Sequence, residues 1–384
     1  MSRRLTIGLR YTHQDQWVGG LYYVRNLVKA LGLLPTGQRP RLLIVGGDKV
    51  ALQDLTAATG YPDLGRISRT RIHREPAPRL RIPFAREAAE GIDLILMGAP
   101  PGLEDRGVHW TPDFQESRFP EFFPPDEVRT RRRLNEQAFA GERHLMVSSR
   151  DAAGDLARFY GRDDARVHVV HFASFLPADV LSTDGAELRR RYGLPERYFL
   201  CANQAWKHKN HGLILRALAL MPAADRPTVA FTGKEDDPRD PDYAPSLRRL
   251  AAELGVADRT AFLGFLPRAD QLGLMAGSVA VIQPSLCEGW STVVEDAKAL
   301  GRHVLASDIA VHREQLDHNA DVFGPESPAD LAALLDRYRS ANPAVRPLDY
   351  GQVQQQFARD LWTMIVAVER DLRRRRIDRL VIRR

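Results

Sequence analysis

The chain has 384 residues, of which 44% are hydrophobic and 27% are charged, with a formal net charge of +6 at pH 7. These values exclude a disordered chain and predict a folded protein large enough for two domains with buried cores. Only two cysteines occur, Cys201 and Cys287, and their wide separation excludes a disulfide scaffold and a metal site of paired cysteines. The shortage of cysteine favours a reducing cytoplasm.

The basic residues are nearly all arginines, whose planar guanidinium suits phosphate, so phosphate-bearing ligands or an anionic membrane fit the charge. No zinc-finger spacing, RNP motif or helix-turn-helix is recognisable, and we expect no nucleic-acid partner. The start lacks the apolar segment of a signal peptide, and no stretch approaches the ~18 apolar residues that span a membrane. We therefore expect a cytoplasmic protein, either free or held peripherally at the inner face of the membrane.

The first half of the chain alternates short apolar strands with amphipathic helices. The first strand is followed by a polar loop with Gly19 and Gly20, and then by an expected helix at residues 21–34 with its apolar side chains on one face. This alternation predicts a parallel sheet with helices on both faces. The expected strands are residues 5–9, 41–45, 92–97 and 145–148.

The same alternation restarts after about residue 172, with a helix expected at residues 210–221. We therefore predict an N-terminal Rossmann-like domain at residues 1–172 and a C-terminal one at residues 173–345. Ligands of such doubly wound sheets bind beyond the carboxyl ends of the strands. The strands expected in the second half are residues 198–202, 229–232, 261–263, 280–283 and 304–307.

Residues 346–384 have a different pattern, with apolar residues at helical spacing followed by the arginine-rich end RDLRRRRIDRLVIRR. We predict a C-terminal helix that packs back on the N-terminal domain. Its basic tail has two interpretations, a solvated surface and a contact with an anionic membrane.

The segment from 283 to 312 carries the richest chemistry. A strand ends at Gln283, Glu288 follows in a loop, and Ser291 or Thr292 is placed to cap a helix that Gly301 ends. The N-terminus of a helix offers free N–H groups to an anion. Glu295 and Asp296 lie one turn inside, where carboxylates bind sugar or ribose hydroxyls or are simply favoured by the helix dipole.

These residues resemble glycosyltransferase family 4, the retaining enzymes of the GT-B fold. Glu288-Gly289-Trp290 matches the first part of the family signature, and the second acid, after seven intervening residues, falls on Asp296, with Glu295 one position short. The resemblance implies that Glu288 contacts the donor sugar and that Asp296, or Glu295, contacts the ribose. It assigns the remaining donor-binding positions of this loop to Gly289, Trp290, Ser291 and Thr292, with Ser291 in place of a family glycine.

A second matching segment, YFLCANQAWKHKNHGL, begins at Tyr198. Family members carry an arginine after this strand and a lysine five residues later, both aimed at the donor diphosphate. Lys209 matches the lysine, Gln204 stands where the arginine is expected, and Lys207 is placed to supply the missing charge. Cations at these positions would stabilise the negative charge that the leaving diphosphate gains. The alternative is a solvated Lys-His-Lys loop.

The N-terminal half also matches the family. Gly19 and Gly20 resemble its glycine loop, which lets the backbone approach a phosphate or an acceptor. The segment from Trp110 to Phe123 resembles the acceptor-side loop of one branch, with Asp113 on the family's His-Asp pair and Pro112 in place of the histidine. Without that histidine, Asp113, Gln115 and Glu116 are the candidates for the acceptor-side contact, and His109 is a weaker one. We predict that Asp113 is catalytic, together with Glu288 and Lys209.

The resemblance implies an α/β GT-B fold, with two Rossmann-like doubly wound parallel-sheet domains facing a central cleft. It implies retaining transfer of a sugar from a nucleotide sugar to a saccharide or lipid-linked acceptor in envelope polysaccharide or glycoconjugate synthesis. It also implies no cofactor and no metal, since no DxD run ends a strand and the loop with Asp236 and Asp237 looks solvated. Two rivals stay open, a nucleotide-sugar epimerase and a non-catalytic nucleotide-sugar-binding protein.

Overall fold

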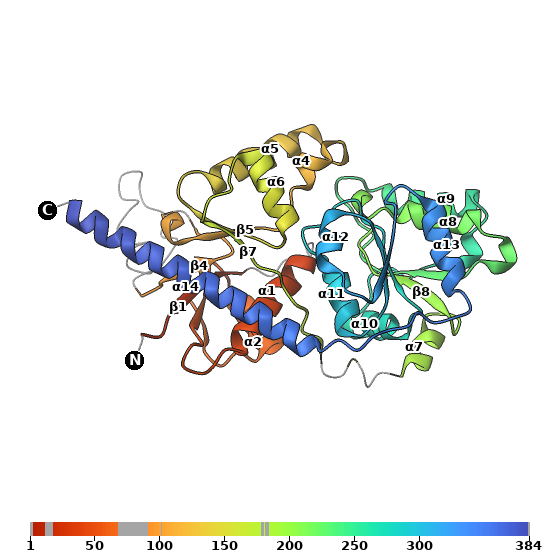
Figure 1. The fold of residues 1–384 in the computed structure, drawn as a ribbon, viewed down its shortest axis with the longest axis horizontal. Helices are drawn as coiled ribbons and strands as arrows, with labels where there is room; N and C mark the ends of the chain where they lie inside the picture. The colour runs from red at the N-terminus through yellow and green to blue at the C-terminus, as the bar shows by residue number, and fades with distance from the viewer. Residues whose placement is uncertain are drawn as a thin grey trace. The chain divides into compact units, whose positions relative to one another are not determined.

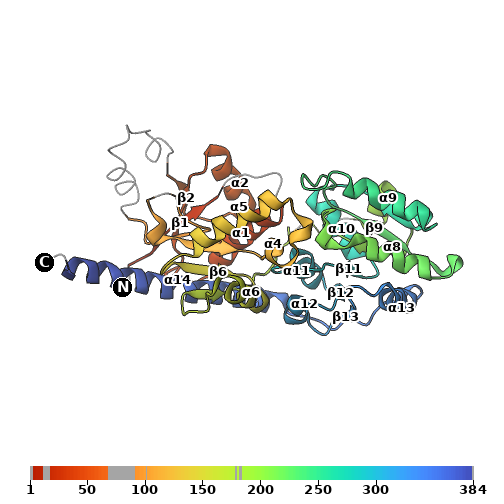
Figure 2. The same ribbon diagram turned by 90° about the horizontal axis from the view of Figure 1, so that it is seen from above.

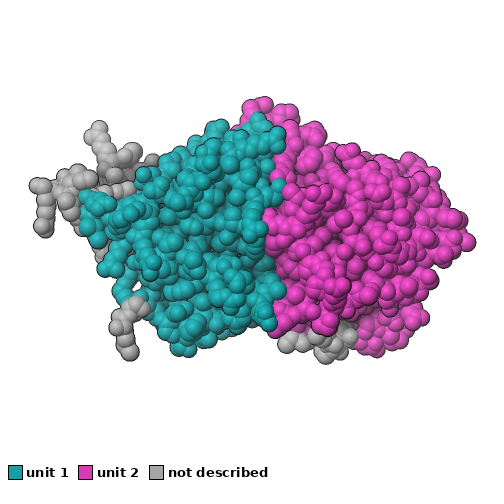
Figure 3. Space-filling model, in the orientation of Figure 1, with its two compact units in different colours: residues 1–114, 130–173, 351–384 teal, residues 115–129, 174–350 magenta. Residues whose placement is uncertain are grey.

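The structure is a computed structural model, and it describes residues 3–11, 18–67, 91–100, 102–177, 180 and 184–382. The chain divides into two compact units (Figure 3). Unit 1 contains residues 1–114, 130–173 and 351–384, and unit 2 contains residues 115–129 and 174–350. The division after residue 173 lies close to the predicted domain boundary, whereas the segment 115–129 groups with unit 2.

Unit 1 is built on parallel strands, as the alternating pattern predicts. Its first sheet has the order β3-β2-β1-β4, and its second has the order β5-β6-β7. A parallel bridge between Ile95 and Gly107 links the two sheets, so the order continues from β4 into β5. The strands are β1 Thr6–Arg10, β2 Arg41–Val45, β3 Leu64–Arg66, β4 Leu94–Leu96, β5 Val108–Thr111, β6 His144–Val147 and β7 Val167–Val169.

The helices of this half follow local capping signals. Asp48 caps α2 (Lys49–Thr59) by accepting a hydrogen bond from Ala51 N, and Ser149 caps α6 (Arg150–Tyr160) in the same way. The first helix, α1 (Val18–Gly32), starts earlier than predicted. Gly19 and Gly20 therefore belong to the first turn of a helix and not to a loop. Glycine is tolerated there because the first N–H groups of a helix lack an intrahelical partner. The segment 115–139 adds α4 (Gln115–Arg118) and α5 (Pro125–Phe139).

The C-terminal helix α14 (Tyr350–Ile382) lies along unit 1 (Figures 1 and 2), to which residues 351–384 belong. Its apolar face is buried at Phe357, Leu361, Ile365 and Val368, as the helical spacing predicts. None of the helices in the described ranges is both long and apolar enough to cross a bilayer.

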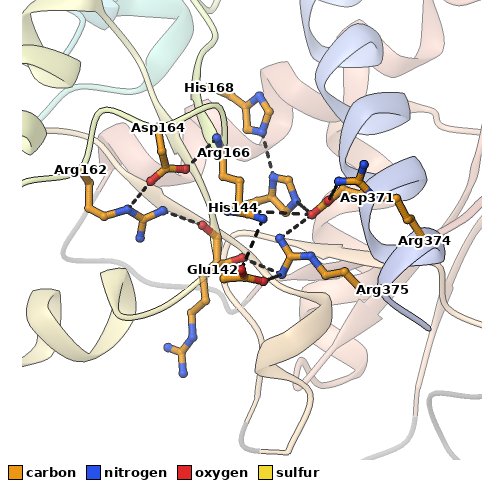
Figure 4. A network of polar contacts seen from close by, with 10 residues as sticks. Glu142, His144, Arg162, Asp164, Arg166, His168, Asp371, Arg374 and Arg375 are labelled. Carbon is orange, nitrogen blue, oxygen red and sulfur yellow. Dashed lines mark hydrogen bonds and ion pairs between the residues drawn. The ribbon is translucent and has the colours of Figure 1, made fainter. Parts of the chain in front are cut away.

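A polar network holds the far end of α14 (Figure 4). His144 Nε2 lies 3.0 Å from Asp371 Oδ2, and His144 Nδ1 lies 3.0 Å from His168 Nε2. Because a carboxylate only accepts, His144 donates through Nε2 and accepts at Nδ1 from His168. Arg375 pairs with both Asp371 and Glu142 and is 20% exposed. Part of the basic tail is therefore used in docking the helix and is not a free solvated surface.

Unit 2 contains one parallel sheet of six strands in the order β10-β9-β8-β11-β12-β13. In chain order within the unit this is 3-2-1-4-5-6, the arrangement of the Rossmann fold. The predicted strands of this half are all present, each within two residues of its expected ends. The strands are β8 Tyr198–Cys201, β9 Thr228–Phe231, β10 Thr260–Phe262, β11 Val281–Gln283, β12 Val304–Ser307 and β13 Ala320–Phe323.

Helices cover both faces of this sheet. Alternate residues of β8 point to opposite faces, so that Phe199 packs with α8 and α13 while Leu200 packs with α10 and α11. Strands buried on both faces are apolar throughout, which explains why sequence YFLC showed no polar alternation. The helices are α7 Gly185–Arg191, α8 His211–Leu220, α9 Tyr243–Glu253, α10 Arg268–Gly277, α11 Thr292–Ala299, α12 Ala310–Gln315 and α13 Pro328–Tyr338.

Four short strands were not predicted from the sequence, namely β3, β5, β7 and β13. β5 includes Trp110 and Thr111, which the sequence analysis assigned to a loop. β7 and β13 lie at sheet edges and contain partly exposed residues, so their apolar pattern is weak.

Candidate active site

The carboxyl ends of β8 and β11 flank the point where the strand order of unit 2 reverses. From β8 the order runs outward through β9 and β10 on one side and through β11 to β13 on the other. Loops leaving the two central strands diverge at such a point and form a ligand-binding crevice. Lys209 follows β8 and Glu288 follows β11, so the topology brings together two residues 79 positions apart.

Lys209 and Glu288 form an ion pair at this edge, with Nζ 2.5 Å from Oε1 and side chains that are 15% and 9% exposed. Lys209 ends a short 3-10 helix, Lys207–Lys209, after which Asn210, with a φ of 54°, turns the chain into α8. Burial by itself raises the pKa of Glu288, but the neighbouring groups, of which the charge of Lys209 has the largest effect, together lower it more, and the pKa lies below its usual value. Glu288 is therefore ionised at neutral pH.

Gln283 binds the same carboxylate oxygen as Lys209. Its Nε2 donates to Glu288 Oε1 at 2.7 Å and to Ser285 Oγ at 3.0 Å, while its Oε1 accepts from Asn203 Nδ2 at 3.0 Å. Gln283 is fully buried and Asn203 is 5% exposed. Neither residue was singled out from the sequence. A polar residue at the end of an otherwise apolar strand is the signal that could have found Gln283.

The loop that carries Glu288 leads into α11, whose start is held tightly. Ser291, and not Thr292, is the capping residue, because its Oγ accepts from Val294 N at 3.3 Å. Gln315 grips the backbone of Ser291, accepting from its N–H at 3.0 Å and donating to its carbonyl at 2.7 Å. Of the other residues predicted to bind the donor here, Gly289 is buried, and Trp290 and Thr292, the first residue of α11, are half-buried.

Glu295 and Asp296, the two acids left open by the spacing, have different surroundings. Glu295 is fully buried, and both of its oxygens are used, Oε1 by Gln315 and Lys298 and Oε2 by Tyr350. Asp296 is 1% exposed and receives hydrogen bonds on Oδ1 alone, from Ser174 at 2.7 Å and Arg268 at 2.6 Å.

Asp296 Oδ2 has no hydrogen-bond partner in the described part of the chain. Buried carboxylate oxygens are normally paired, so an unused one indicates a place for a donor from outside the protein. Glu295 has no such unused oxygen.

The other residues after β8 are arranged differently from Lys209. Lys207 pairs with Asp240 at 2.9 Å and is 41% exposed, and Gln204 is half-buried. The backbone beside Gln204 is approached closely by Gly233, where a Cβ atom would lie 2.2 Å from Asn203 O and where φ is 144°. Only glycine fits this position.

Asp113, Gly19 and Gly20 belong to unit 1. Asp113 is half-buried and follows β5, and the two glycines lie in the first turn of α1. Their expected roles at the acceptor or the phosphate remain predictions.

No group of three or more His, Cys, Asp and Glu side chains within the described ranges is arranged to hold a metal ion. Asp237 is 3% exposed and its side chain is bound by Arg239, so this part of the loop is not solvated as expected. A cavity of about 410 Å³ lies at the opposite, amino edge of the sheet, beside His303 and Arg302. Arg197 lines it too but is occupied by carbonyl groups at the end of α13.

His312 is a further buried side chain near Glu288 that the sequence analysis did not select. It is fully buried, and its Nδ1 lies 2.8 Å from the carbonyl oxygen of Ser307. The carbonyl fixes the proton on Nδ1, so Nε2, which has no partner among the described residues, carries a lone pair. Burial lowers the pKa of His312, which keeps the ring neutral.

Comparison with known proteins connects this geometry to a family. Residues 186–348 match the family described as glycosyl transferases group 1. O-antigen chain mannosyltransferase RfbU of Salmonella typhimurium is 24% identical over 221 residues, which cover 56% of this chain and 58% of that protein. A D-inositol 3-phosphate glycosyltransferase of Salinispora arenicola is 33% identical over 186 residues, or 45% of this chain and 41% of that protein. These alignments span about half the length of the curated relatives.

Solved structures match over nearly the whole chain. Anabaena Alr3699/HepE, crystallised with UDP and glucose, has a TM-score of 0.63 at 17% identity, covering 98% of this chain and 100% of that one. WaaG, a glycosyltransferase involved in lipopolysaccharide biosynthesis, has a TM-score of 0.59 at 16% identity, covering 94% of both chains. The predicted GT-B fold is confirmed. The predicted family is confirmed for residues 186–348, the part of the chain that matches the glycosyl transferases group 1 family.

Proposed function

We propose that this chain is a retaining glycosyltransferase that moves a sugar from a nucleoside diphosphate to a hydroxyl acceptor without a metal ion or other cofactor. The observation that carries the proposal is the buried ion pair of Lys209 and Glu288 at the switch point of a Rossmann sheet. Lys209 offers a cation to the diphosphate of the donor, and Glu288 offers a hydrogen-bond acceptor to the hydroxyl groups of its sugar.

The donor would lie along the loops after β8 and β11. Lys209 and the first N–H groups of α11 would face the diphosphate, and Glu288 would accept hydrogen bonds from sugar hydroxyls. Asp296 is the better candidate for the ribose, because its Oδ2 is unused whereas both oxygens of Glu295 are bound inside unit 2. The UDP and UDP-glucose found in Anabaena HepE support a nucleoside diphosphate sugar as the donor class.

In the reaction, the bond between the anomeric carbon and the diphosphate oxygen breaks, and the acceptor oxygen bonds to the same face of that carbon. The acceptor proton passes to the departing phosphate, so no protein nucleophile is needed. Lys209 stabilises the charge that develops on the diphosphate in this step. Asp113, in unit 1, is the residue that we assign to the acceptor side.

For the acceptor we propose a saccharide or lipid-linked intermediate of envelope polysaccharide synthesis. Two of the similar proteins support this class, since RfbU is named an O-antigen chain mannosyltransferase and WaaG is described as involved in lipopolysaccharide biosynthesis. The net charge of +6 favours an anionic acceptor or membrane surface. Equal rates with neutral soluble acceptors and with lipid-linked ones would contradict this part of the proposal.

The first test is the thermal unfolding midpoint with UDP, GDP, ADP, dTDP and their common sugar nucleotides in EDTA, with NAD as a control. A ligand that binds only the folded state raises the midpoint. We expect one nucleoside diphosphate to stabilise the protein without metal and NAD to have no effect. Stabilisation by NAD alone would overturn the proposal.

Product analysis separates the two rivals. Incubation with the donor and an acceptor mixture should release free nucleoside diphosphate and a glycosylated acceptor. An epimerase would instead return an altered sugar nucleotide with no acceptor, and a binding protein would show binding without turnover over the whole acceptor panel.

A further inference from the structure

The carboxylate of Glu288 is gripped by a neutral amide as well as by Lys209. Gln283 Nε2 lies 2.7 Å from the same oxygen, Oε1, that Lys209 Nζ approaches to 2.5 Å. A diphosphate would compete with Glu288 for Lys209, because the ammonium group of Lys209 and the diphosphate carry opposite charges. The amide of Gln283 carries no charge and is fully buried, so its hydrogen bond to Glu288 would persist when a donor binds.

The orientation of this amide is set by its neighbours. Glu288 is ionised and accepts only, so Gln283 must present Nε2 to it. Asn203 Nδ2 donates to Gln283 Oε1 at 3.0 Å from the loop after β8. Hydrogen bonds therefore run from Asn203 to Gln283, from Gln283 to Glu288 and from Lys209 to Glu288. They link the carboxyl ends of β8 and β11.

A second buried glutamine acts on the same loop at a different place. Gln315, at the end of α12, bonds the N–H and carbonyl of Ser291 and also Glu295, and these hydrogen bonds do not involve Glu288. The loop from β11 to α11 is thus held by Gln283 at the carboxylate of Glu288 and by Gln315 at the start of the helix. Gln283 therefore acts on the carboxylate that we assign to the sugar. Gln315 acts on the start of α11, whose N–H groups we assign to the phosphate.

We propose that Gln283 is a positioning residue that sets the Glu288 carboxylate for the sugar of the donor, acting through Glu288 and not on the nucleotide. The inference rests on the proposed function, because it takes the donor to be a nucleoside diphosphate sugar. A neutral amide is required at this position, since a carboxylate would repel Glu288 and an apolar side chain would leave one of its buried oxygens short of a donor.

The test compares Gln283→Met with Gln315→Met, two replacements of similar volume that remove the amide. The probes are UDP and UDP-glucose, or the diphosphate and sugar nucleotide of whichever base stabilises the protein, and the measurement is Kd by titration calorimetry. For Gln283→Met we expect UDP affinity within about twofold of the original and UDP-glucose affinity about tenfold weaker. For Gln315→Met we expect both affinities to fall by similar factors.

A third variant, Gln283→Glu, covers the case in which Gln283→Met does not fold, and it adds a pH readout. Two adjacent carboxylates share a proton more readily than one alone, so UDP-glucose binding by this variant should strengthen as pH falls from 8 to 5. If Gln283 had a purely structural role, the variant would bind UDP and UDP-glucose more weakly by the same factor, and the pH profile of binding would be unchanged.

Equal loss of UDP and UDP-glucose affinity in Gln283→Met, or no loss of either, would overturn the inference and leave the proposed function standing. Absence of binding of every nucleoside diphosphate by the unaltered protein would overturn both.

Discussion

Two polar networks, one in each unit, are each built around a mostly buried carboxylate, and their differences are informative. In unit 1, Asp371 binds His144 and the guanidinium groups of Arg374 and Arg375, so several donors surround it. In unit 2, Glu288 is bound by a single cation, Lys209, and by neutral donors, the amide of Gln283 and the hydroxyl of Ser285. The first network ties a helix to a sheet, whereas the second stands at the sheet edge where ligands bind.

The comparison teaches that a buried, charged carboxylate is not by itself evidence of a catalytic site. Both acids have lowered pKa values, and both are mostly buried. What separates them is topology, since Glu288 follows a central strand at the switch point and Asp371 lies on the C-terminal helix. Perturbed acids occur in structural ion-pair networks as well as in active sites.

The largest effect should come from Glu288→Gln. This change removes the charge that pairs with Lys209 and the acceptor assigned to the sugar, so we expect the transfer rate to fall at least ~100-fold. Lys209 loses its charged partner in this variant, so the unfolding midpoint is measured beside the rate to show that the protein is still folded. The matched control is Glu187→Gln, an exposed residue of α7 paired with Arg191, which should retain its full rate. A variant with an unchanged rate would remove Glu288 from the site.

A smaller and graded effect should separate the two lysines of the loop after β8. Lys209→Met should weaken binding of the nucleoside diphosphate by ~10–100-fold, because a buried charge-assisted contact is lost. Lys207→Met should weaken it by only about threefold, since Lys207 is 41% exposed and already paired with Asp240. Titration calorimetry of both variants decides the assignment, and a reversed order would make Lys207 the phosphate ligand.

In unit 1 the expected effect is on stability and not on chemistry. Burial by itself would raise the pKa of Asp371, but hydrogen bonds from His144 and Arg375 lower it to about 2. Asp371→Ala should therefore reduce the free energy of unfolding by about 2 kcal/mol at pH 7, because cations are left unpaired. Urea titration measures this loss, and Asp378→Ala, an exposed position on the same helix, serves as the control.

For unaltered Asp371, the way its contribution to stability changes with pH follows from its lowered pKa. Its contribution to stability is complete above the unfolded value near 4 and is lost as pH falls from there towards 2. An Asp371→Ala loss that persists unchanged at pH 2 would contradict the assignment.

The smallest effect should come from the histidines of the same network. Burial lowers the pKa of His168 to about 4, with a further contribution from His144, so the folded state holds His168 neutral. Its contribution is therefore present above pH 6.5 and is lost as pH falls towards 4. Asp371, Arg166, Arg375 and Asp164 are the charged groups around the two rings.

The measurement is the urea midpoint at several pH values. We expect the midpoint to decline between pH 6.5 and 4, and His168→Gln to flatten that decline. An identical slope in this variant would show that other groups cause the acid sensitivity.

The C-terminal half of the fold was predictable from the sequence because each strand of a doubly wound sheet is a short apolar run with a helix after it. The sequence also placed Glu288 in the loop after a strand and Asp296 one turn inside the following helix, where the structure has them. The edge strands β7 and β13 were missed because exposed residues interrupt their pattern. Gly19 and Gly20 were assigned to a loop because glycine usually breaks helices, although the first turn tolerates it.

The sequence by itself determined which residues carry charge and which loops they occupy, because strand and helix periodicity are local properties. Only the tertiary structure decided that Gln283 and Lys209 share one oxygen of Glu288, that both oxygens of Glu295 are used inside unit 2, and that Arg375 docks α14. These contacts join residues far apart in the chain. They depend on which strands become neighbours in the sheet and which helices pack on it, and spacing along the chain does not encode that order.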